Sequence, residues 1–368
     1  MLLPMSFHDD CLVFDGHTDV PTRLWESPAD LSQPLADRQI DLPRLRAGGV
    51  DALVFALYVP SPLPPDLGWE HALKMYRATE EQLARGFGLA KVVTAEGVRR
   101  AVARGEVAVV YGLENGRPLV LPKALDDCAK MGIRYVTLTH VGTHEWCDAS
   151  TDTPAHNGLS DEGVRIVRGM NRRAILPDLS HVSDAAVEQV LEVSTVPPIA
   201  SHSSARTLCD VPRNLPDPLI REIARKGGLV MANTYPAFIG PDAARANRER
   251  LAELKPALEE LEEGYLRDPT KVHLEINRLF SGHTLPPVPL ATFVDHVLHL
   301  VELAGEEHVG IGTDFDGIPE TLEGFEDPSR FPALTAALLE RGVDRGGVRL
   351  ILGENFLRAL ELAEKVAR

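Results

Sequence analysis

The sequence predicts an α/β protein, a (β/α)8 TIM-like barrel with a helical insertion before strand eight. Eight short apolar runs rich in β-branched residues recur along the chain, and longer segments of helical pattern separate them. Strands that are apolar on both faces and alternate with helices are typical of a parallel sheet wrapped in helices. Eight such units in one chain indicate a closed barrel rather than an open sheet.

The predicted strands share this apolar, β-branched character. They are Cys11–Asp15, Asp51–Leu57, Val107–Leu113, Ile133–Thr139, Ala174–Ser180, Pro197–Ser201, Gly228–Asn233 and Val309–Thr313.

Local chemistry supports the helices that lie between these strands. Ser160 is followed by two acids and then by apolar residues at helical spacing, which is typical of a helix N-terminus. Ser183 and Asp217 begin further helices in a similar way. Gly227-Gly228 then ends a helix directly before the seventh predicted strand.

One region departs from this alternation. About 75 residues separate strands seven and eight, more than a single crossover helix needs. We expect a helical insertion over residues 240–290, within a single domain that spans residues 1–368. Its charged segment Pro241–Tyr265 predicts an exposed amphipathic helix, followed by a short helix at Thr270–Phe280. The insertion is interpreted as a lid or an oligomer contact, with a solvated excursion as the equal alternative.

Composition excludes several classes of protein. The net charge of −16 argues against nucleic acid as a partner. No stretch approaches the ~20 apolar residues of a membrane span, and the N-terminus carries no basic lead or long apolar run. The four cysteines form no Cys-x-x-Cys pair, which fits a reducing compartment. We therefore expect a cytoplasmic protein with neither a membrane anchor nor a signal peptide.

Six of the eight predicted strands end in a histidine or a carboxylate. In a parallel barrel these ends open on one face, which carries the active site. Imidazole mixed with carboxylate is the ligand set that zinc and similar divalent metals prefer. A lone histidine at a strand end is more often structural, but the recurrence of these residues at one end of successive strands favours a metal site. The residues are His17, Asp19, Glu114, His140, His181, His202 and Asp314.

Several ordered motifs resemble the membrane (renal) dipeptidase family of the metal-dependent amidohydrolase superfamily. The resemblance runs from about residue 11 to about residue 365. Its motifs are Asp15-Gly16-His17-Thr18-Asp19, Asp178-Leu179-Ser180-His181, Ser201-His202-Ser203-Ser204, Arg213-Asn214, Gly312-Thr313-Asp314-Phe315-Asp316-Gly317 and Gly353-Glu354-Asn355-Phe356.

The resemblance implies a metallo-dipeptidase with two Zn2+ ions per chain. His17 and Asp19 would hold one metal. His181 and His202 would hold the other, and Glu114 would bridge the two. A hydroxide between the metals would attack the peptide bond of a dipeptide. The family often permits a C-terminal D-residue, and the sequence leaves the preferred stereochemistry open.

The resemblance also implies three roles outside the metal ligands. His140 would lie beside the substrate carbonyl and donate a hydrogen bond to the developing oxyanion. Asp314 would accept the proton of the hydroxide and return it to the leaving amine. Arg213 would bind the free carboxylate of the substrate, because a planar guanidinium pairs well with a carboxylate.

Departures from the family pattern concern substrate preference rather than the metal ligands. Asn115 replaces a glycine after the bridging acid, Thr143 lies where the family often has asparagine, and Phe238 lies near a family tyrosine. Two rival functions stay open. One is a hydrolase of the same superfamily that acts on a cyclic amide or lactone, and the other is a non-catalytic binding protein. A homodimer is compatible with the sequence, and no residue pattern decides it.

Overall fold

The computed structural model describes residues 7–86, 88–262, 264, 266 and 268–367. The segment 1–6, on which part of the signal-peptide prediction rests, lies outside the described residues, as does Tyr265, the predicted end of the insertion helix. Among the described helices, none combines the length and the apolar character needed to cross a membrane.

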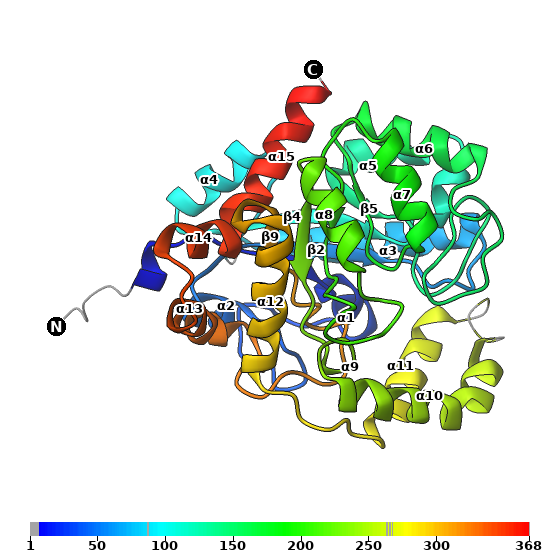
Figure 1. Ribbon diagram of the computed structural model, residues 1–368. Helices are drawn as coiled ribbons and strands as arrows, with labels where there is room; N and C mark the ends of the chain where they lie inside the picture. The colour runs from blue at the N-terminus through cyan, green and yellow to red at the C-terminus, as the bar shows by residue number, and fades with distance from the viewer. Residues whose placement is uncertain (1–6, 87, 263, 265, 267, 368) are drawn as a thin grey trace.

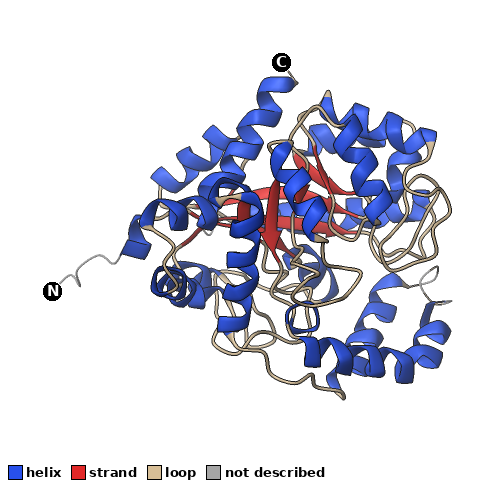
Figure 2. Cartoon of the chain, in the orientation of Figure 1, coloured by secondary structure: helices blue, strands red, loops and turns tan. Residues whose placement is uncertain are grey.

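The centre of the molecule is a nearly closed barrel of eight parallel strands surrounded by helices (Figures 1 and 2). Neighbouring strands pair in chain order. The barrel strands are β1 (Val13–Thr18), β2 (Val50–Tyr58), β4 (Val107–Glu114), β5 (Ile133–Thr137), β6 (Leu176–Asp178), β7 (Ile199–Ala200), β8 (Leu229–Ala232) and β9 (Val309–Ile311).

The seam between β9 and β1 closes at the C-terminal ends of the two strands. A parallel bridge joins Thr18 and Phe315. The Asp19 amide donates to the Phe315 carbonyl at 2.9 Å, and the Asp314 amide donates to the His17 carbonyl at 3.0 Å. The backbone that completes the barrel therefore belongs to residues predicted to hold or face the metals.

All eight predicted strands are present, with shifted ends. β1 extends to Thr18, three residues beyond the predicted end, and β7 has only two residues in regular pairing. A ninth strand, β3 (Leu89–Lys91), was not predicted and pairs with the beginning of β4 off the barrel path. Three residues with little alternation give too weak a pattern to indicate a strand.

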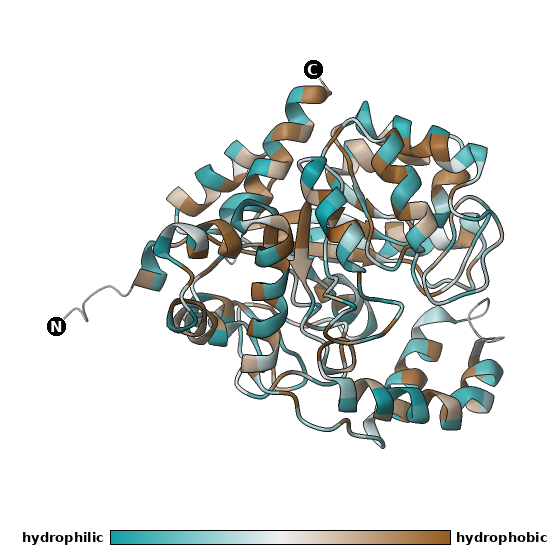
Figure 3. Ribbon diagram, in the orientation of Figure 1, coloured by the Kyte–Doolittle hydropathy of each residue, from teal (hydrophilic) through white to brown (hydrophobic). Residues whose placement is uncertain are grey.

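Alternate residues along the strands separate the core into two layers. In β2, Ala52 and Val54 belong to one cluster, while Leu53 and Phe55 belong to the other. This is the period of two that directs successive side chains to opposite faces of a sheet. Apolar residues accordingly concentrate on the central strands in Figure 3.

Gly112 makes room inside the barrel for one large side chain. A Cβ atom on Gly112 would lie 2.6 Å from the ring of Tyr135. Tyr135 is fully buried, and its hydroxyl reaches the imidazole of His17 at 2.7 Å. The barrel interior thus contributes directly to the site above it.

The helices follow the predicted order, and their caps are the predicted ones in two cases. The side chains of Ser160 and Ser183 each accept a backbone hydrogen bond at 3.3 Å, from Gly163 and Ala186. The helices are α1 (Val20–Glu26), α2 (Leu42–Ala47), α3 (Pro65–Leu83), α4 (Ala95–Ala103), α5 (Ala124–Met131), α6 (Asp161–Asn171), α7 (Asp184–Val193), α8 (Asp217–Arg225), α9 (Pro236–Ile239), α10 (Pro241–Glu262), α11 (Pro269–Ser281), α12 (Leu290–Ala304), α13 (Phe331–Glu340), α14 (Arg345–Arg349) and α15 (Asn355–Val366).

The insertion between β8 and β9 folds back onto the barrel as the helices α10 and α11 (Figure 1). The Trp25 indole donates to the Thr270 hydroxyl at 2.7 Å, which ties α11 to α1. Arg250 of α10 donates to the Tyr235 hydroxyl at 2.6 Å. The insertion is therefore anchored to the barrel at both helices, and a purely solvated excursion is the wrong interpretation.

Candidate metal centre

The predicted site residues converge at the C-terminal face of the barrel. Glu114 is the last residue of β4, and its side chain is buried. One of its oxygens, Oε2, lies 3.5 Å from Nε2 of His17. The other oxygen, Oε1, lies 3.3 Å from Nε2 of His181 and 3.6 Å from Nε2 of His202. One carboxylate thus faces two sets of donors, one with each oxygen.

His181 and His202 present two imidazole nitrogens to the same point. Their Nε2 atoms lie 3.0 Å apart. Two nitrogens bound to one tetrahedral zinc ion would stand about 3.3 Å apart, since each Zn–N bond is about 2.0–2.1 Å. Burial is the main cause that lowers the pKa of both imidazoles well below the ordinary value, followed by nearby Arg213 for His181 and by His17 for His202. Both are therefore neutral, which is the form that binds a metal.

Hydrogen bonds fix the orientation of His202. The Ser201 hydroxyl donates to Asp178 Oδ2 at 2.6 Å and lies 2.7 Å from His202 Nδ1. Because the hydroxyl hydrogen is given to the carboxylate, Nδ1–H of His202 donates to the serine oxygen. The lone pair is then left on Nε2, and such supporting partners are typical of metal-binding histidines.

His17 is held by an analogous arrangement. The Tyr135 hydroxyl donates to the Gly16 carbonyl at 3.2 Å and lies 2.7 Å from His17 Nδ1. The Nε2 atom is buried, has no hydrogen-bond partner in the described part of the chain, and lies 3.6 Å from Asp19 Oδ2. Burial alone would lower the pKa of His17, but Tyr135, Glu114 and Asp19 together raise it well above the ordinary value. The surroundings of Nε2 therefore favour a positive charge, which a bound metal would supply.

Asp19 follows the end of β1 and lies at the N-cap position of α1, where its side chain makes no capping hydrogen bond. Its side chain still faces the same point as His17. Burial, followed by the charge of Glu114, raises the pKa of Asp19. Where buried carboxylates lie close together, a cation bound between them stabilises their charged form.

Asp314 completes this side of the site from the loop after β9. Its φ of +66° is in the left-handed region, and such a conformation persists in a non-glycine residue where the surroundings determine it. Asn233 donates to Asp314 Oδ2 at 2.9 Å. Burial raises the pKa of Asp314, and the nearby carboxylate of Asp19 adds to the shift. A Cβ atom on Gly317 would lie 2.2 Å from Asp19 Oδ2, so the loop can cross here only with a glycine.

The potential ligands form overlapping sets around the centre. Three sets have donor atoms within 4.8 Å of one another. They are His17 with Glu114 and His202, Glu114 with His140 and His181, and His17 with Asp19 and Asp314. Glu114 belongs to two of the three sets, which agrees with a central position. The sets also bring His140 and Asp314 within ligand distance, although the sequence assigned His140 to the substrate carbonyl and Asp314 to proton transfer.

His140 lies beside this centre and lines the cavity above it. Its ring packs against His181 at 4.3 Å and edge-on against Tyr58 at 4.9 Å between centroids. Burial, with Arg213 and His17 as further causes, lowers the pKa of His140 to about 3. The imidazole is thus neutral, and it carries one N–H hydrogen.

Arg213 is close to the centre but is not among the described residues that line the cavity. Its Nη1 donates to the Ser203 hydroxyl at 3.0 Å and its Nη2 to the His202 carbonyl at 2.8 Å. Nε is buried without a partner in the described chain. Phe238, which does line the cavity, lies 5.3 Å from the guanidinium. Burial lowers the pKa of Arg213 to about 10, so the group stays charged at neutral pH.

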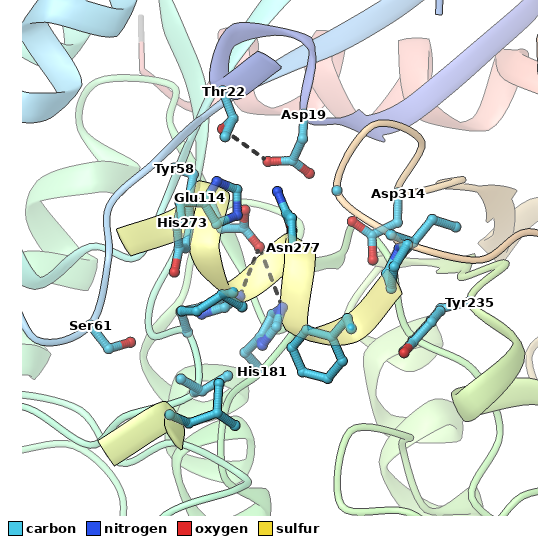
Figure 4. A pocket seen from close by; sticks show the side chains of 18 of the residues that line it. Asp19, Thr22, Tyr58, Ser61, Glu114, His181, Tyr235, His273, Asn277 and Asp314 are labelled. Atoms are coloured by element: carbon cyan, nitrogen blue, oxygen red, sulfur yellow. Dashed lines mark hydrogen bonds and ion pairs between the residues drawn. The ribbon is translucent and has the colours of Figure 1, made fainter. Parts of the chain in front are cut away.

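A cavity of about 400 Å³ lies over these residues (Figure 4). This volume falls in the range of about 300–1,000 Å³ that is typical of small-molecule sites. Asp19, Glu114, His140, His181 and Asp314 form its polar side. The rest of its wall includes residues that sequence reasoning missed, namely Tyr58, Tyr235, Leu258, His273, Ile276, Asn277 and Phe280.

Sequence reasoning also missed the residues that orient the ligands. Tyr135 lies inside a strand, and nothing in the local pattern shows that it supports His17. Asp178 is the first residue of a motif that was recognised, and its position at a strand end was the available signal for a supporting role.

Comparison with known proteins agrees with this geometry. Residues 5–368 match the family model of membrane dipeptidase, peptidase family M19. The chain is 31% identical to dipeptidase verJ of Clonostachys rogersoniana, over 97% of this chain and 86% of that protein. It is 29% identical to an uncharacterized dipeptidase of Schizosaccharomyces pombe, over 96% of this chain and 81% of that protein.

Two solved structures have the same fold. The probable dipeptidase PvdM of Pseudomonas aeruginosa superposes with a TM-score of 0.83 at 26% identity, covering 98% of this chain and 97% of that one. A metallopeptidase of Rhodobacter sphaeroides, bound to a phosphinate mimic of the dipeptide L-Ala-D-Ala, superposes with a TM-score of 0.79 at 25% identity. The match covers 96% of this chain and 99% of that one. The chain belongs to the membrane dipeptidase family, peptidase family M19, and is a metallo-dipeptidase.

Proposed function

We propose that this chain hydrolyses the peptide bond of dipeptides, including those with a C-terminal D-residue, with two zinc ions held around Glu114. The observation that carries the proposal is the position of the Glu114 carboxylate. One oxygen faces His17, and the other faces His181 and His202. Carboxylates that span two cations about 3.5–4 Å apart are typical of two-metal hydrolases.

The donor set favours zinc over harder cations. Three imidazoles and two carboxylates converge here, whereas magnesium and calcium prefer oxygen ligands alone. His17 and Asp19 would hold one ion, and His181 and His202 the other. The partnerless Nε2 of His17 supports this assignment, since a buried nitrogen without a hydrogen bond is costly unless something binds it.

Bound divalent cations would supply an activated water and polarise the scissile carbonyl. Asp314 then accepts the proton of the attacking water and returns it to the leaving amine. Its side chain lines the cavity, and the hydrogen bond from Asn233 leaves Oδ1 available for the proton. A positioned carboxylate that first accepts and then donates a proton is a common device of hydrolases.

His140 stabilises the negative charge that develops on the carbonyl oxygen of the substrate. Its Nδ1 is buried without a partner in the described chain, and the ring lines the cavity next to His181. A neutral imidazole can donate one hydrogen bond to that oxygen. Removing a comparable donor in other hydrolases costs roughly 2.7–4 kcal/mol of transition-state stabilisation.

Arg213 attracts the free carboxylate of the dipeptide. Its charge is buried and is not neutralised by a direct ion pair among the described residues. The Nε–H group has no partner among them, and the guanidinium lies 5.3 Å from the ring of Phe238, which lines the cavity. We therefore propose a contact through Nε–H, or charge attraction past the Phe238 ring, in place of the direct guanidinium–carboxylate pair expected from the sequence.

The test is a kinetic panel with zinc-loaded protein. It compares L-Xaa-L-Xaa and L-Xaa-D-Xaa dipeptides with a tripeptide, a lactone and a hydantoin. Hydrolysis of dipeptides of both series, with no turnover of the tripeptide or the rings, is expected. Turnover of the lactone or the hydantoin alone would instead support the rival hydrolase activity.

A further inference from the structure

One wall of the cavity is a single face of α11, the second helix of the insertion. His273, Ile276, Asn277 and Phe280 all line the cavity. They are spaced at i, i+3, i+4 and i+7, which places them on one side of a helix. Figure 4 shows the His273 and Asn277 side chains reaching from α11 into the space that Asp19, Glu114 and Asp314 border. Leu274 of the same helix is exposed.

Part of this wall is apolar. Ile276 and Phe280, together with Leu258 of α10, form what we call the insertion patch. No lysine or arginine occurs among the described residues that line the cavity, and its three carboxylates surround the candidate metal centre. The insertion patch therefore offers an apolar side chain a favourable contact, and it offers a charged side chain no partner.

Neighbouring side chains hold the Phe280 ring in place. The Arg250 guanidinium lies 4.7 Å from the ring centroid. Arg250 is buried, donates to the Tyr235 hydroxyl at 2.6 Å and pairs with Glu320 at 2.5 Å. A ring fixed before the substrate arrives loses little conformational freedom on binding, which favours selective recognition.

The helix itself is tied to the metal centre through α1, the helix that begins directly after Asp19. His273 pairs with the buried carboxylate of Glu26, which also accepts from Arg23 at 2.9 Å. Trp25 donates to Thr270 at the start of α11. The distance between the insertion patch and the candidate metal centre is therefore set by one short, rigid segment.

We propose that α11 determines substrate specificity, and that the insertion patch binds one apolar side chain of the dipeptide. The enzyme would then prefer dipeptides with a leucine-sized or phenylalanine-sized side chain at one of the two positions. This inference rests on the proposed dipeptidase function and adds the class of substrate to it.

The experiment uses two substrate series, Xaa-Ala and Ala-Xaa, in which Xaa is Ala, Leu, Phe or Lys. Wild type is compared with Phe280→Ala, with Ile276→Asp and with Leu274→Ala, the matched control on the exposed side of α11. We expect wild type to favour Leu or Phe over Lys in one series. Phe280→Ala lowers kcat/KM for that substrate by roughly tenfold to a hundredfold, while Ala-Ala changes little.

Ile276→Asp gives the complementary result, because a carboxylate on the wall offers Lys a partner. Its kcat/KM rises for the Lys substrate and falls for the Leu substrate, and Leu274→Ala matches wild type throughout. Binding of phosphinate dipeptide mimics with the same side chains gives the same ranking without turnover. An unchanged ranking in both Phe280→Ala and Ile276→Asp, with the proteins folded and active on Ala-Ala, overturns the inference. A zinc-loaded wild type that cleaves no dipeptide refutes the proposed function itself.

Discussion

The Nε2 atoms of His181 and His202 lie 3.0 Å apart, and both face the same oxygen of Glu114. His181 has a φ of +68°, a left-handed conformation that costs a non-glycine residue about 1–3 kcal/mol. The backbone therefore accepts strain at the residue that brings the second imidazole to this point. We propose that these two buried, neutral nitrogens are ligands of one cation.

Tyr135→Phe tests the support of His17. The change removes only the hydroxyl that contacts His17 Nδ1 and Gly16, and the buried ring keeps its packing. We expect metal affinity to fall by about 10–100-fold, because the imidazole loses the partner that orients it. Competition with a chelator measures the affinity. A metal affinity equal to that of wild type would show that the Tyr135 hydroxyl does not support His17 as a metal ligand.

Asp314→Asn tests the proton transfer. Asparagine keeps the shape of the side chain but cannot accept a proton, so we expect kcat for a dipeptide to fall by about 10²–10⁴-fold. Because Asp314 lies within ligand distance of His17 and Asp19, metal content is measured on the same sample. Full occupancy with low kcat supports the proton-transfer role, whereas a parallel loss of metal would make Asp314 a ligand.

Arg213→Met tests carboxylate recognition. We expect kcat/KM for dipeptides to fall by roughly 10–100-fold, the range for losing one hydrogen bond to a charged group. On a dipeptide amide, which lacks the free carboxylate, the Arg213→Met variant and wild type should have nearly the same kcat/KM. Equal losses on both substrates would contradict the binding role and indicate that Arg213 stabilises the loops at Ser203 and His202.

His296→Gln tests a pH dependence of stability away from the metal centre. His296 accepts from the Ala205 amide at 3.2 Å through Nδ1 and donates to the Ile239 carbonyl at 3.0 Å through Nε2. Only the neutral ring can do both, and burial lowers the pKa of His296 to about 4. The unfolded chain, with a histidine pKa of about 6.5, binds the proton first. Stability is therefore full above about pH 6.5 and is lost as the pH falls towards 4.

Glutamine can make both hydrogen bonds of His296 without titrating. Between pH 7 and pH 5, metal-free wild type should lose roughly 2 kcal/mol more unfolding free energy than His296→Gln. Urea unfolding in the presence of a chelator at the two pH values measures the difference. An equal loss of unfolding free energy between pH 7 and pH 5 in both proteins would contradict the role given to His296.

The strands were predictable from sequence, although their ends were shifted, because a run of apolar, β-branched residues is a local property. The runs that became β4 and β5 are buried and β-branched, so the residue pattern alone places Glu114 and His140 at one face of the barrel. His17 and Asp19 were likewise predicted to lie together, although Asp19 lies at the N-cap position of α1 and does not continue β1.

The wall and the support of the site could not be predicted in the same way. Tyr135 reaches His17 only because the barrel closes and Gly112 leaves room for its ring. The α11 face meets the cavity because Trp25 binds Thr270, a contact between residues 245 positions apart. Neither contact leaves a periodic signal in the sequence, and both depend on tertiary structure.

The most direct test of the central claim is the metal content of the purified protein, measured by elemental mass spectrometry on the sample assayed with a dipeptide. We predict close to two divalent ions per chain in wild type. Glu114→Gln should hold fewer ions and show little activity, and Glu145→Gln, a change at an exposed carboxylate that pairs with Arg117, should match wild type. Full dipeptidase activity in a wild-type sample without divalent metal would contradict the account.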